Sequence, residues 1–247
     1  MRIDYRWTVA ALALAVAGCN KPEAVQAPAG GTAAAPAVPA PAGQDWTETV
    51  AATPEGGFRM GNPAARVKLI EYGALTCPHC AAFEKEASGP LAEMVRSGNV
   101  SWEFRTFLLN GIDVPVSLLA RCQGPGPFFK LIEQVYAEQQ SWIAKLQTMT
   151  PAQQSQIQAV PPEQQPRAVA EAAGLITFFG ARGLPESKAI ACLTDKAAFT
   201  PLEQITKNGV DKDAVTGTPA FVINGQPVKD VASWDMLKPK LDAALAG

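Results

Sequence analysis

Two cysteines in this chain are spaced for thiol–disulfide chemistry. Cys77 and Cys80 frame a Cys-x-x-Cys motif between a strand-like segment and a helix-like one. Free N–H groups at the start of a helix stabilise an anion, so this position favours the thiolate of Cys77, the reactive form of a cysteine. Pro78 suits a first helical turn, and His79 can stabilise the thiolate further by a hydrogen bond or by its positive charge. We therefore predict that Cys77 is the attacking thiol and that Cys80, one turn along, resolves the mixed disulfide.

Two other interpretations of the motif explain the sequence less well. A Cys-x-x-Cys pair can form half of a zinc site, but zinc normally takes a second close pair of ligands, whereas Cys122 and Cys192 lie far apart in the sequence. A purely structural disulfide between Cys77 and Cys80 closes a very small loop and stabilises little. We therefore expect redox chemistry, with no metal and no cofactor.

The composition excludes several other classes of function. The chain has 247 residues, of which 47% are hydrophobic, and a formal net charge of −2. It can therefore bury a full core, and it lacks the basic excess of a nucleic-acid-binding protein. His79 is the single histidine. A serine or cysteine hydrolase needs a histidine remote from its nucleophile, and His-rich catalytic zinc sites need several, so both classes are disfavoured.

The N-terminus has the layout of a bacterial export signal over residues 1–18. Arg2 and Arg6 precede an apolar run at 7–17 that is too short to span a bilayer. The small residues before Cys19 resemble the lipobox of bacterial lipoproteins, which implies cleavage before Cys19 and acylation of that residue. The alternatives are an uncleaved anchor and a soluble secreted form cut elsewhere. We expect a periplasmic protein, lipid-anchored at Cys19, in a compartment where disulfides persist.

Residues 19–45 are interpreted as a lipid-anchored, disordered tether. They are mostly Ala, Pro and Gly with few apolar anchors, a composition that cannot bury enough surface to fold. The folded domain is expected over residues 46–247. It should begin with an edge strand at about 46–50, followed by a turn-rich stretch at 53–63.

A β-α-β unit is predicted around the Cys-x-x-Cys motif. Residues 67–72 are mostly apolar, which is typical of a buried strand. Residues 81–97 have helix-forming composition with apolar spacing, and Gly98 follows them. Residues 100–109 then predict the next strand. This order places the motif at the junction of the first strand and the helix.

The remaining segments predict an α/β fold with an all-helical insertion. Residues at about 114–193 are rich in Ala, Gln and Leu and carry several helix-start signals. A further helix is expected over 196–207, ending at Asn208-Gly209. Residues 218–228 predict a hairpin around an Asn-Gly turn, and residues 233–245 a final helix with Ser at its N-cap. Together they predict a mixed sheet with helices on its faces.

This arrangement resembles the DsbA-like family of periplasmic disulfide oxidoreductases, within the thioredoxin superfamily. The resemblance rests on a strand, the Cys-Pro-His-Cys motif, a helical insertion and Thr218-Pro219 before a hairpin, and it covers residues 46–245. It implies a thioredoxin-like mixed sheet and a cis bond between Thr218 and Pro219, where an ordinary trans strand-entry proline is the alternative. It also implies that an extended substrate segment pairs with the backbone beside Pro219.

Two carboxylates match family positions by their offset from the first cysteine. The resemblance implies that Glu71, in the strand before Cys77, and Glu84, in the helix after it, help to move protons to the buried cysteine. A desolvated carboxylate near a thiol has the raised pKa that this role needs. For Glu84 the alternative is a solvated helix face.

The direction of electron flow stays open at the sequence level. The first hypothesis is a dithiol oxidase that introduces disulfides into newly exported proteins and is reoxidised by a membrane quinone-linked partner of the DsbB type. The second is an isomerase or reductase kept reduced by a membrane electron donor. Thr218 favours it, because strongly oxidising family members commonly carry Val there. A third is a non-enzymatic, chain-holding lipoprotein. A monomer is expected.

Cys122 and Cys192 are expected to form a second, structural disulfide. Both flank helical segments of the insertion, and they are the two cysteines left once Cys19 is acylated and the Cys-x-x-Cys pair is assigned. The oxidising compartment favours their pairing. The alternative is a pair of buried free cysteines that act as small hydrophobic residues.

Overall fold

The computed structural model of this chain describes residues 36–247. The predicted export signal at 1–18, the predicted acylation site Cys19 and the first part of the predicted tether lie outside the described residues. Within the part of the chain that the structure describes, no helix is long and apolar enough to cross a membrane. The export signal, the acylation and the tether therefore stay predictions.

The segment just before the domain is hydrogen-bonded to it. The backbone N–H of Val38 donates to the carbonyl of Ser97 at 2.7 Å. The indole Nε1 of Trp46 donates to the carbonyl of Val38 at 2.8 Å. The end of the predicted tether thus contacts the turn that follows the first long helix.

The strands of the described residues form one mixed sheet in the order β1-β2-β4-β3-β5-β6. The strands are β1 (Val50–Ala52), β2 (Phe58–Gly61), β3 (Val67–Gly73), β4 (Val100–Thr106), β5 (Ala220–Ile223) and β6 (Gln226–Val228). β3 and β4 run parallel, and the other neighbouring pairs are antiparallel. The parallel pair needs a crossover connection, and a helix supplies it as the sequence predicts.

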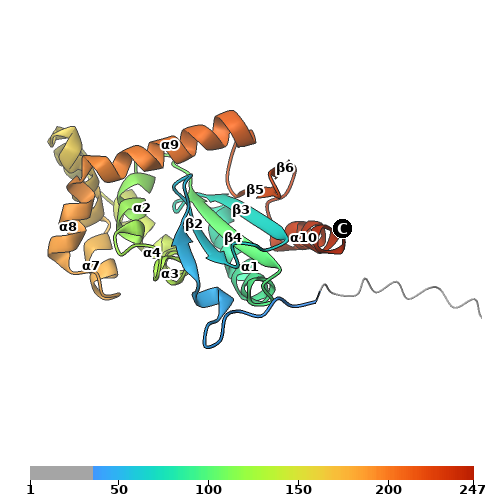
Figure 1. The fold of residues 1–247 in the computed structure, drawn as a ribbon. Helices are drawn as coiled ribbons and strands as arrows, with labels where there is room; N and C mark the ends of the chain where they lie inside the picture. Colours follow the sequence, from blue (N-terminus) through green and yellow to red (C-terminus); the bar gives the residue numbers. More distant parts are fainter. Residues whose placement is uncertain (1–35) are drawn as a thin grey trace, which may run out of the picture. The chain divides into compact units, whose positions relative to one another are not determined.

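Helices make up most of the remaining chain (Figure 1). They are η1 (Trp46–Glu48), α1 (Pro78–Arg96), α2 (Asp113–Arg121), α3 (Phe128–Ala137), α4 (Gln139–Gln147), α5 (Pro151–Ala159), η2 (Pro162–Gln164), α6 (Gln165–Ala172), α7 (Leu175–Gly180), α8 (Glu186–Thr194), α9 (Lys196–Asp213) and α10 (Trp234–Ala246). The elements from α2 to α8 contain no strand, so the predicted all-helical insertion is confirmed, together with the mixed sheet. At α5, Thr150 and Gln153 form the capping box that their spacing indicates.

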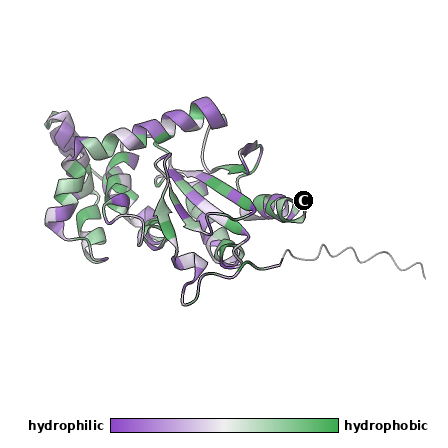
Figure 2. Ribbon diagram, viewed as in Figure 1, coloured by the Kyte–Doolittle hydropathy of each residue, from purple (hydrophilic) through white to green (hydrophobic). Residues whose placement is uncertain are grey.

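The two faces of the sheet are covered by different helices. Side chains alternate along a strand. Leu69 of β3 belongs to the main hydrophobic core with Phe83 of α1 and Leu237 of α10. Tyr72 of β3 belongs instead to a second cluster with Ile205 of α9. Figure 1 shows α9 along one side of the sheet and α1 on the other, and α9 is largely hydrophilic in Figure 2, as suits a helix that covers one edge of the core.

Two expectations for the start of the domain are wrong. Residues 46–48 form the short helix η1 rather than a strand, because the Asp45 carboxylate accepts a hydrogen bond from Thr47 N and caps a turn. The edge strand begins later, at Val50. The predicted turn-rich stretch contains β2, which pairs with β4 and buries Phe58. Its glycine-rich surroundings conceal the strand pattern.

The helix expected at 196–207 runs further than predicted. α9 continues through Gly209 to Asp213 and ends at Ala214, which takes a left-handed conformation with φ 54°. A Cβ on Gly209 would lie 2.8 Å from the Tyr72 ring, so the glycine is needed for close packing and does not end the helix. By contrast the Asn-Gly turn is confirmed, since Asn224 and Gly225 have φ of 50° and 79° between β5 and β6.

Candidate active site

The Cys-x-x-Cys motif lies at the N-terminus of α1, directly after β3. Cys77 is the N-cap residue, with extended φ and ψ of −77° and 120°, and Pro78 occupies the first turn. Cys77 is 4% exposed, whereas Cys80 is 0% exposed. Both are free thiols. Both cysteines are buried, but Cys77 keeps a small exposed area and Cys80 keeps none.

The loop before β5 lies across this sulfur. The peptide bond between Thr218 and Pro219 is cis, in the form that the family resemblance implies. The thiol of Cys77 donates to the carbonyl oxygen of Thr218, with 3.2 Å between the two atoms. The Thr218 side-chain oxygen is buried and has no hydrogen-bond partner among the described residues. The Cys77 thiol and the backbone beside Pro219 are thus adjacent.

The surroundings of Cys77 favour its thiolate. A hydrogen bond from the Cys80 thiol is the largest cause and lowers the pKa of Cys77 to about 5, although burial acts in the opposite direction. The backbone N–H groups of Cys80 and His79 also lower this pKa. Burial raises the pKa of Cys80 above its usual value, so that thiol stays protonated. The two sulfurs differ in the way that an attacking and a resolving cysteine must differ.

Glu71 and Glu84 are both buried near the resolving cysteine. Glu71 is 0% exposed and accepts a hydrogen bond from the indole of Trp102 at 3.1 Å. Burial raises its pKa well above the usual value. Glu84 is 3% exposed, so it does not lie on a solvated helix face, and burial raises its pKa to about 8. Each carboxyl has a buried oxygen without a hydrogen-bond partner among the described residues.

His79 and Pro78 are exposed at the entrance to the site. No hydrogen bond or ion pair joins the His79 ring to another described residue. The contribution of His79 to the lowered pKa of Cys77 comes through its backbone N–H. The predicted role of the imidazole is untested and stays a prediction.

The segment that leads into the motif, residues 74–77, is called the redox loop below. Three side chains of the helical insertion contact it, and the sequence does not single out any of them. They are Asp113 of α2, Tyr136 of α3 and Gln139 of α4, and all three are buried. Asp113 interrupts an apolar stretch, which is a faint signal of a special role. Tyr136 and Gln139 carry no such signal in the sequence, because they reach the redox loop only through the packing of the insertion against it.

Cys122 and Cys192 are joined by a disulfide, with their Cα atoms 5.9 Å apart. The bond links the C-cap of α2 to α8 across a sequence separation of 70 residues. It lies within the insertion and contacts no residue of the redox loop through a described hydrogen bond. Its position is that of a structural crosslink.

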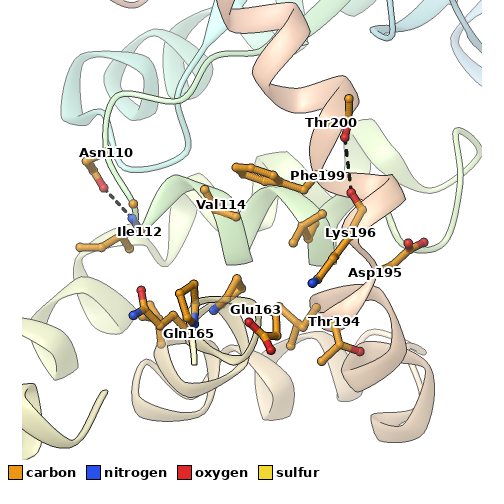
Figure 3. A pocket seen from close by; sticks show the side chains of 16 residues that line it. Asn110, Ile112, Val114, Glu163, Gln165, Thr194, Asp195, Lys196, Phe199 and Thr200 are labelled. Atoms are coloured by element: carbon orange, nitrogen blue, oxygen red, sulfur yellow. Dashed lines mark hydrogen bonds between the residues drawn. The ribbon is translucent and has the colours of Figure 1, made fainter. Parts of the chain in front are cut away.

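A pocket of about 870 Å³ opens between the helical insertion and the start of α9 (Figure 3). Val114 of α2 and Phe199 of α9 lie along one wall, opposite Glu163 and Gln165. Asn110 lies at its rim, and its side-chain amide donates to the Thr76 hydroxyl at 2.9 Å. The rim of the pocket is therefore hydrogen-bonded to Thr76, the residue that precedes Cys77 in the chain.

Comparison with known proteins decides the family. The sequence model of the family described as Thioredoxin matches residues 53–243, which is most of the chain. This chain belongs to the thioredoxin family. A solved structure described as protein-disulfide isomerase from Novosphingobium aromaticivorans is 34% identical, with a TM-score of 0.72 over 76% of this chain and 96% of that one. The thioredoxin-like fold and the resemblance to DsbA-like proteins are thereby confirmed.

More distant relatives agree with this assignment. The structure of Wolbachia pipientis alpha-DsbA1 aligns with a TM-score of 0.60 over 76% of this chain and 89% of that one at 18% identity, so it supports the fold alone. A Rickettsia prowazekii protein described as a candidate protein-disulfide oxidoreductase is 23% identical over 189 residues, which are 75% of this thioredoxin-family chain and 60% of that protein. A similarly described Rickettsia bellii protein matches over 35% of this chain and 34% of its own length. The chain thus spans less than two thirds of these curated relatives.

Proposed function

We propose that this protein is a thiol:disulfide oxidoreductase that uses Cys77 and Cys80. The observation that carries the proposal is the contrast between the two sulfurs. Cys77 stands at the start of α1 with its pKa lowered to about 5, and Cys80 is fully buried with its pKa raised. Cys77 is thus a good leaving group, whereas Cys80 needs a nearby group to exchange its proton with.

The exchange reaction balances with the residues present. A substrate thiolate attacks the Cys77 sulfur of the oxidised pair, the bond between Cys77 and Cys80 breaks, and Cys80 leaves with the electron pair. Because burial raises the pKa of Glu71, and that of Glu84 to about 8, these carboxyl groups can supply the proton that Cys80 takes up. A second substrate thiolate then attacks the substrate sulfur of the mixed disulfide, and Cys77 leaves as its stable thiolate. The substrate loses two electrons and gains a disulfide, and the protein is left as a dithiol.

The substrates of this reaction are proposed to be cysteine-containing polypeptides that have not finished folding. An extended segment would pair with the backbone beside Pro219 while its cysteine meets Cys77. The pocket bounded by Val114 and Phe199 would receive an apolar stretch flanking that cysteine, because its walls are largely apolar and its rim is hydrogen-bonded to Thr76 through Asn110.

The role of the pocket can be tested with Phe199→Ser. This variant should raise the KM for a peptide with an apolar flank and leave the KM for a matched serine-flanked peptide unchanged. Equal KM changes for both peptides would show that the pocket does not bind the apolar flank.

The favoured direction is oxidation of exported proteins. A stabilised Cys77 thiolate makes the reduced form comparatively stable, which makes the disulfide oxidising. The dithiol would then be reoxidised by a membrane quinone-linked partner of the DsbB type. In this proposal the domain is exported, held at the periplasmic face of a membrane by acylated Cys19, and active as a monomer.

A second direction, isomerisation or reduction, has its own support. Thr218 precedes the cis proline where strongly oxidising members of the family commonly carry Val, and the solved relative at 34% identity is described as a protein-disulfide isomerase. In this case a membrane electron donor would keep Cys77 and Cys80 reduced.

Trapping the redox state of Cys77 and Cys80 in living cells separates the two directions. Acid quenching followed by alkylation with a mass-tagged maleimide reads the state of each cysteine. A mainly oxidised pair is expected for the oxidase, and a mainly reduced pair would support the isomerase. A Cys77→Ser variant, in which Cys80 cannot pair, gives the reduced reference.

A further inference from the structure

Two neutral side chains of the insertion hold the carbonyl groups of the redox loop. The Tyr136 hydroxyl donates to the carbonyl of Ala74 at 3.2 Å. The Gln139 side-chain amide Nε2 donates to the carbonyl of Leu75 at 2.9 Å and to that of Cys77 at 3.0 Å. The end of α3 and the start of α4 therefore bind the loop on both sides of Thr76.

The remaining residue of the redox loop is held by a carboxylate. Thr76 N–H donates to Oδ1 of Asp113 at 2.9 Å, and the Thr76 hydroxyl donates to Oδ2 at 3.0 Å. The same Oδ2 accepts from the backbone N–H groups of Leu109 and Asn110. Each residue from 74 to 77 thus has a backbone group bonded to a side chain of the insertion.

These contacts are shielded from water, so nothing in the solvent can replace them. Gln139 is 1% exposed, Tyr136 is 4% exposed and Asp113 is 0% exposed. The Gln139 oxygen Oε1 has no hydrogen-bond partner among the described residues. Burying an unpaired amide oxygen costs free energy. The two hydrogen bonds that Nε2 donates to the redox loop offset this cost.

The bond to the Cys77 carbonyl acts where the thiolate is stabilised. Cys77 is the N-cap of α1, and its carbonyl also accepts the first bond of the helix, from Ala81 N at 3.2 Å. Gln139 thereby holds the backbone of the residue whose sulfur receives hydrogen bonds from the N–H groups of His79 and Cys80. A loosened carbonyl would let the sulfur move away from these donors.

We propose that Gln139 and Tyr136 are positioning residues, through which the helical insertion sets the stability of the Cys77 thiolate and the reduction potential of the Cys77–Cys80 pair. This inference rests on the proposed redox function of the pair. Without these two side chains the reduced form loses stabilisation relative to the disulfide, so the disulfide becomes less oxidising.

Equilibration of the full chain with glutathione tests the proposal. In Gln139→Met, which keeps the length of the side chain and removes the donor, we expect the equilibrium constant to shift about tenfold toward the disulfide, roughly 30 mV for a two-electron couple. The Cys77 pKa should rise in parallel. Tyr136→Phe removes one bond without changing any charge and should shift the equilibrium in the same direction by less. If Gln139→Met fails to fold, the glutathione equilibrium of Tyr136→Phe still tests the proposal.

Trp142→Phe is the matched control. Trp142 lies on the same helix as Gln139, is 2% exposed and donates to the Val135 carbonyl at 3.1 Å, with no bond to the redox loop. It should lower the thermal midpoint and leave the glutathione equilibrium and the Cys77 pKa unchanged. Equal shifts in Trp142→Phe, or none in both Gln139→Met and Tyr136→Phe, would overturn the positioning role. Failure of the wild-type pair to exchange with glutathione at all would instead refute the redox function.

Discussion

The sulfur of Cys77 lies 3.2 Å from the carbonyl oxygen of Thr218, so the reactive thiol of the dithiol form points at the backbone that precedes the cis proline. A carbonyl oxygen accepts a bond from a thiol, but it repels a thiolate. Ionisation of Cys77 must therefore release this contact. In the proposed function, the freed carbonyl would be available to the N–H of an extended substrate, so loss of the Cys77 proton would open this backbone position for pairing.

The Cys77 thiol should titrate near pH 5. The hydrogen bond from Cys80 and the donors at the start of α1 stabilise its thiolate, as the lowered pKa of Cys77 indicates. Thiolate ultraviolet absorbance against pH in the reduced protein measures the midpoint directly, with Cys77→Ser as the blank. A midpoint at or above the free-thiol value of about 8.5 would contradict the assignment of Cys77 as the attacking residue.

Replacing Cys80 by Ala should trap mixed disulfides through Cys77. Once the resolving thiol is gone, a substrate bound to Cys77 is released only by another thiol, so adducts accumulate. Non-reducing electrophoresis of cell extracts, compared with a Cys77→Ser, Cys80→Ala double variant, detects them. If the single and double variants give the same pattern, the pair is not catalytic.

His79→Ser isolates the contribution of the imidazole. The substitution keeps the backbone N–H that helps to lower the pKa of Cys77 and removes only the exposed ring. We expect the Cys77 pKa to rise and the disulfide to become less oxidising. Each 30 mV by which the reduction potential falls corresponds to about 1.4 kcal/mol for a two-electron couple. An unchanged potential in glutathione buffer would show that the helix start acts without the ring.

Glu84→Gln should make the oxidised protein more stable at alkaline pH. Burial raises the pKa of Glu84 from 4.5 to about 8, so between these values the folded state holds a proton that the unfolded state has lost. The free energy of unfolding then falls as pH rises through this window, by up to about 1.4 kcal/mol per pH unit for one proton. Gln carries no such proton, so the variant should lose this part of the slope.

Chemical denaturation of the oxidised protein at several pH values measures that slope without interference from the cysteines. Glu86→Gln, an exposed change on the same helix, is the control and should keep the wild-type slope. Parallel slopes for wild type and Glu84→Gln would mean that Glu84 is ionised in the folded state.

A double Cys122→Ala, Cys192→Ala variant should lose stability and keep its redox chemistry. Closing a loop of 70 residues restricts the unfolded chain by about 4 kcal/mol in the chain-entropy model. The thermal midpoint should therefore fall, while dithiol oxidation at low temperature stays near the wild-type rate. A variant that melts like the wild type would show that the bond contributes little, and a shifted potential would show that it affects the active site.

Local sequence signals predict the features of this fold that depend on neighbouring residues. The Asn224-Gly225 turn needs positive φ at both residues, and those residue types allow it. The position of Cys77 at the start of α1 follows likewise from a strand-like and a helix-like segment meeting at the motif. These signals are strong because the residue types themselves determine the backbone conformation.

Features that depend on packing between distant segments cannot be predicted from local sequence patterns. Gly209 has the residue type of a helix end, yet it serves the approach of α9 to Tyr72. β2 is identified by its pairing with β4 rather than by its own composition. Gln139 becomes part of the site only because α4 packs against the redox loop.

The disulfide of the insertion also determines the covalent topology of the domain. α5 has no buried residue, and it lies inside the loop that Cys122 and Cys192 close. A protease cut within α5 would therefore leave two fragments that stay covalently joined, each carrying part of the fold. Such a nicked chain would separate into its pieces only after reduction of that bond, which makes the insertion tolerant of backbone cleavage at its most exposed helix.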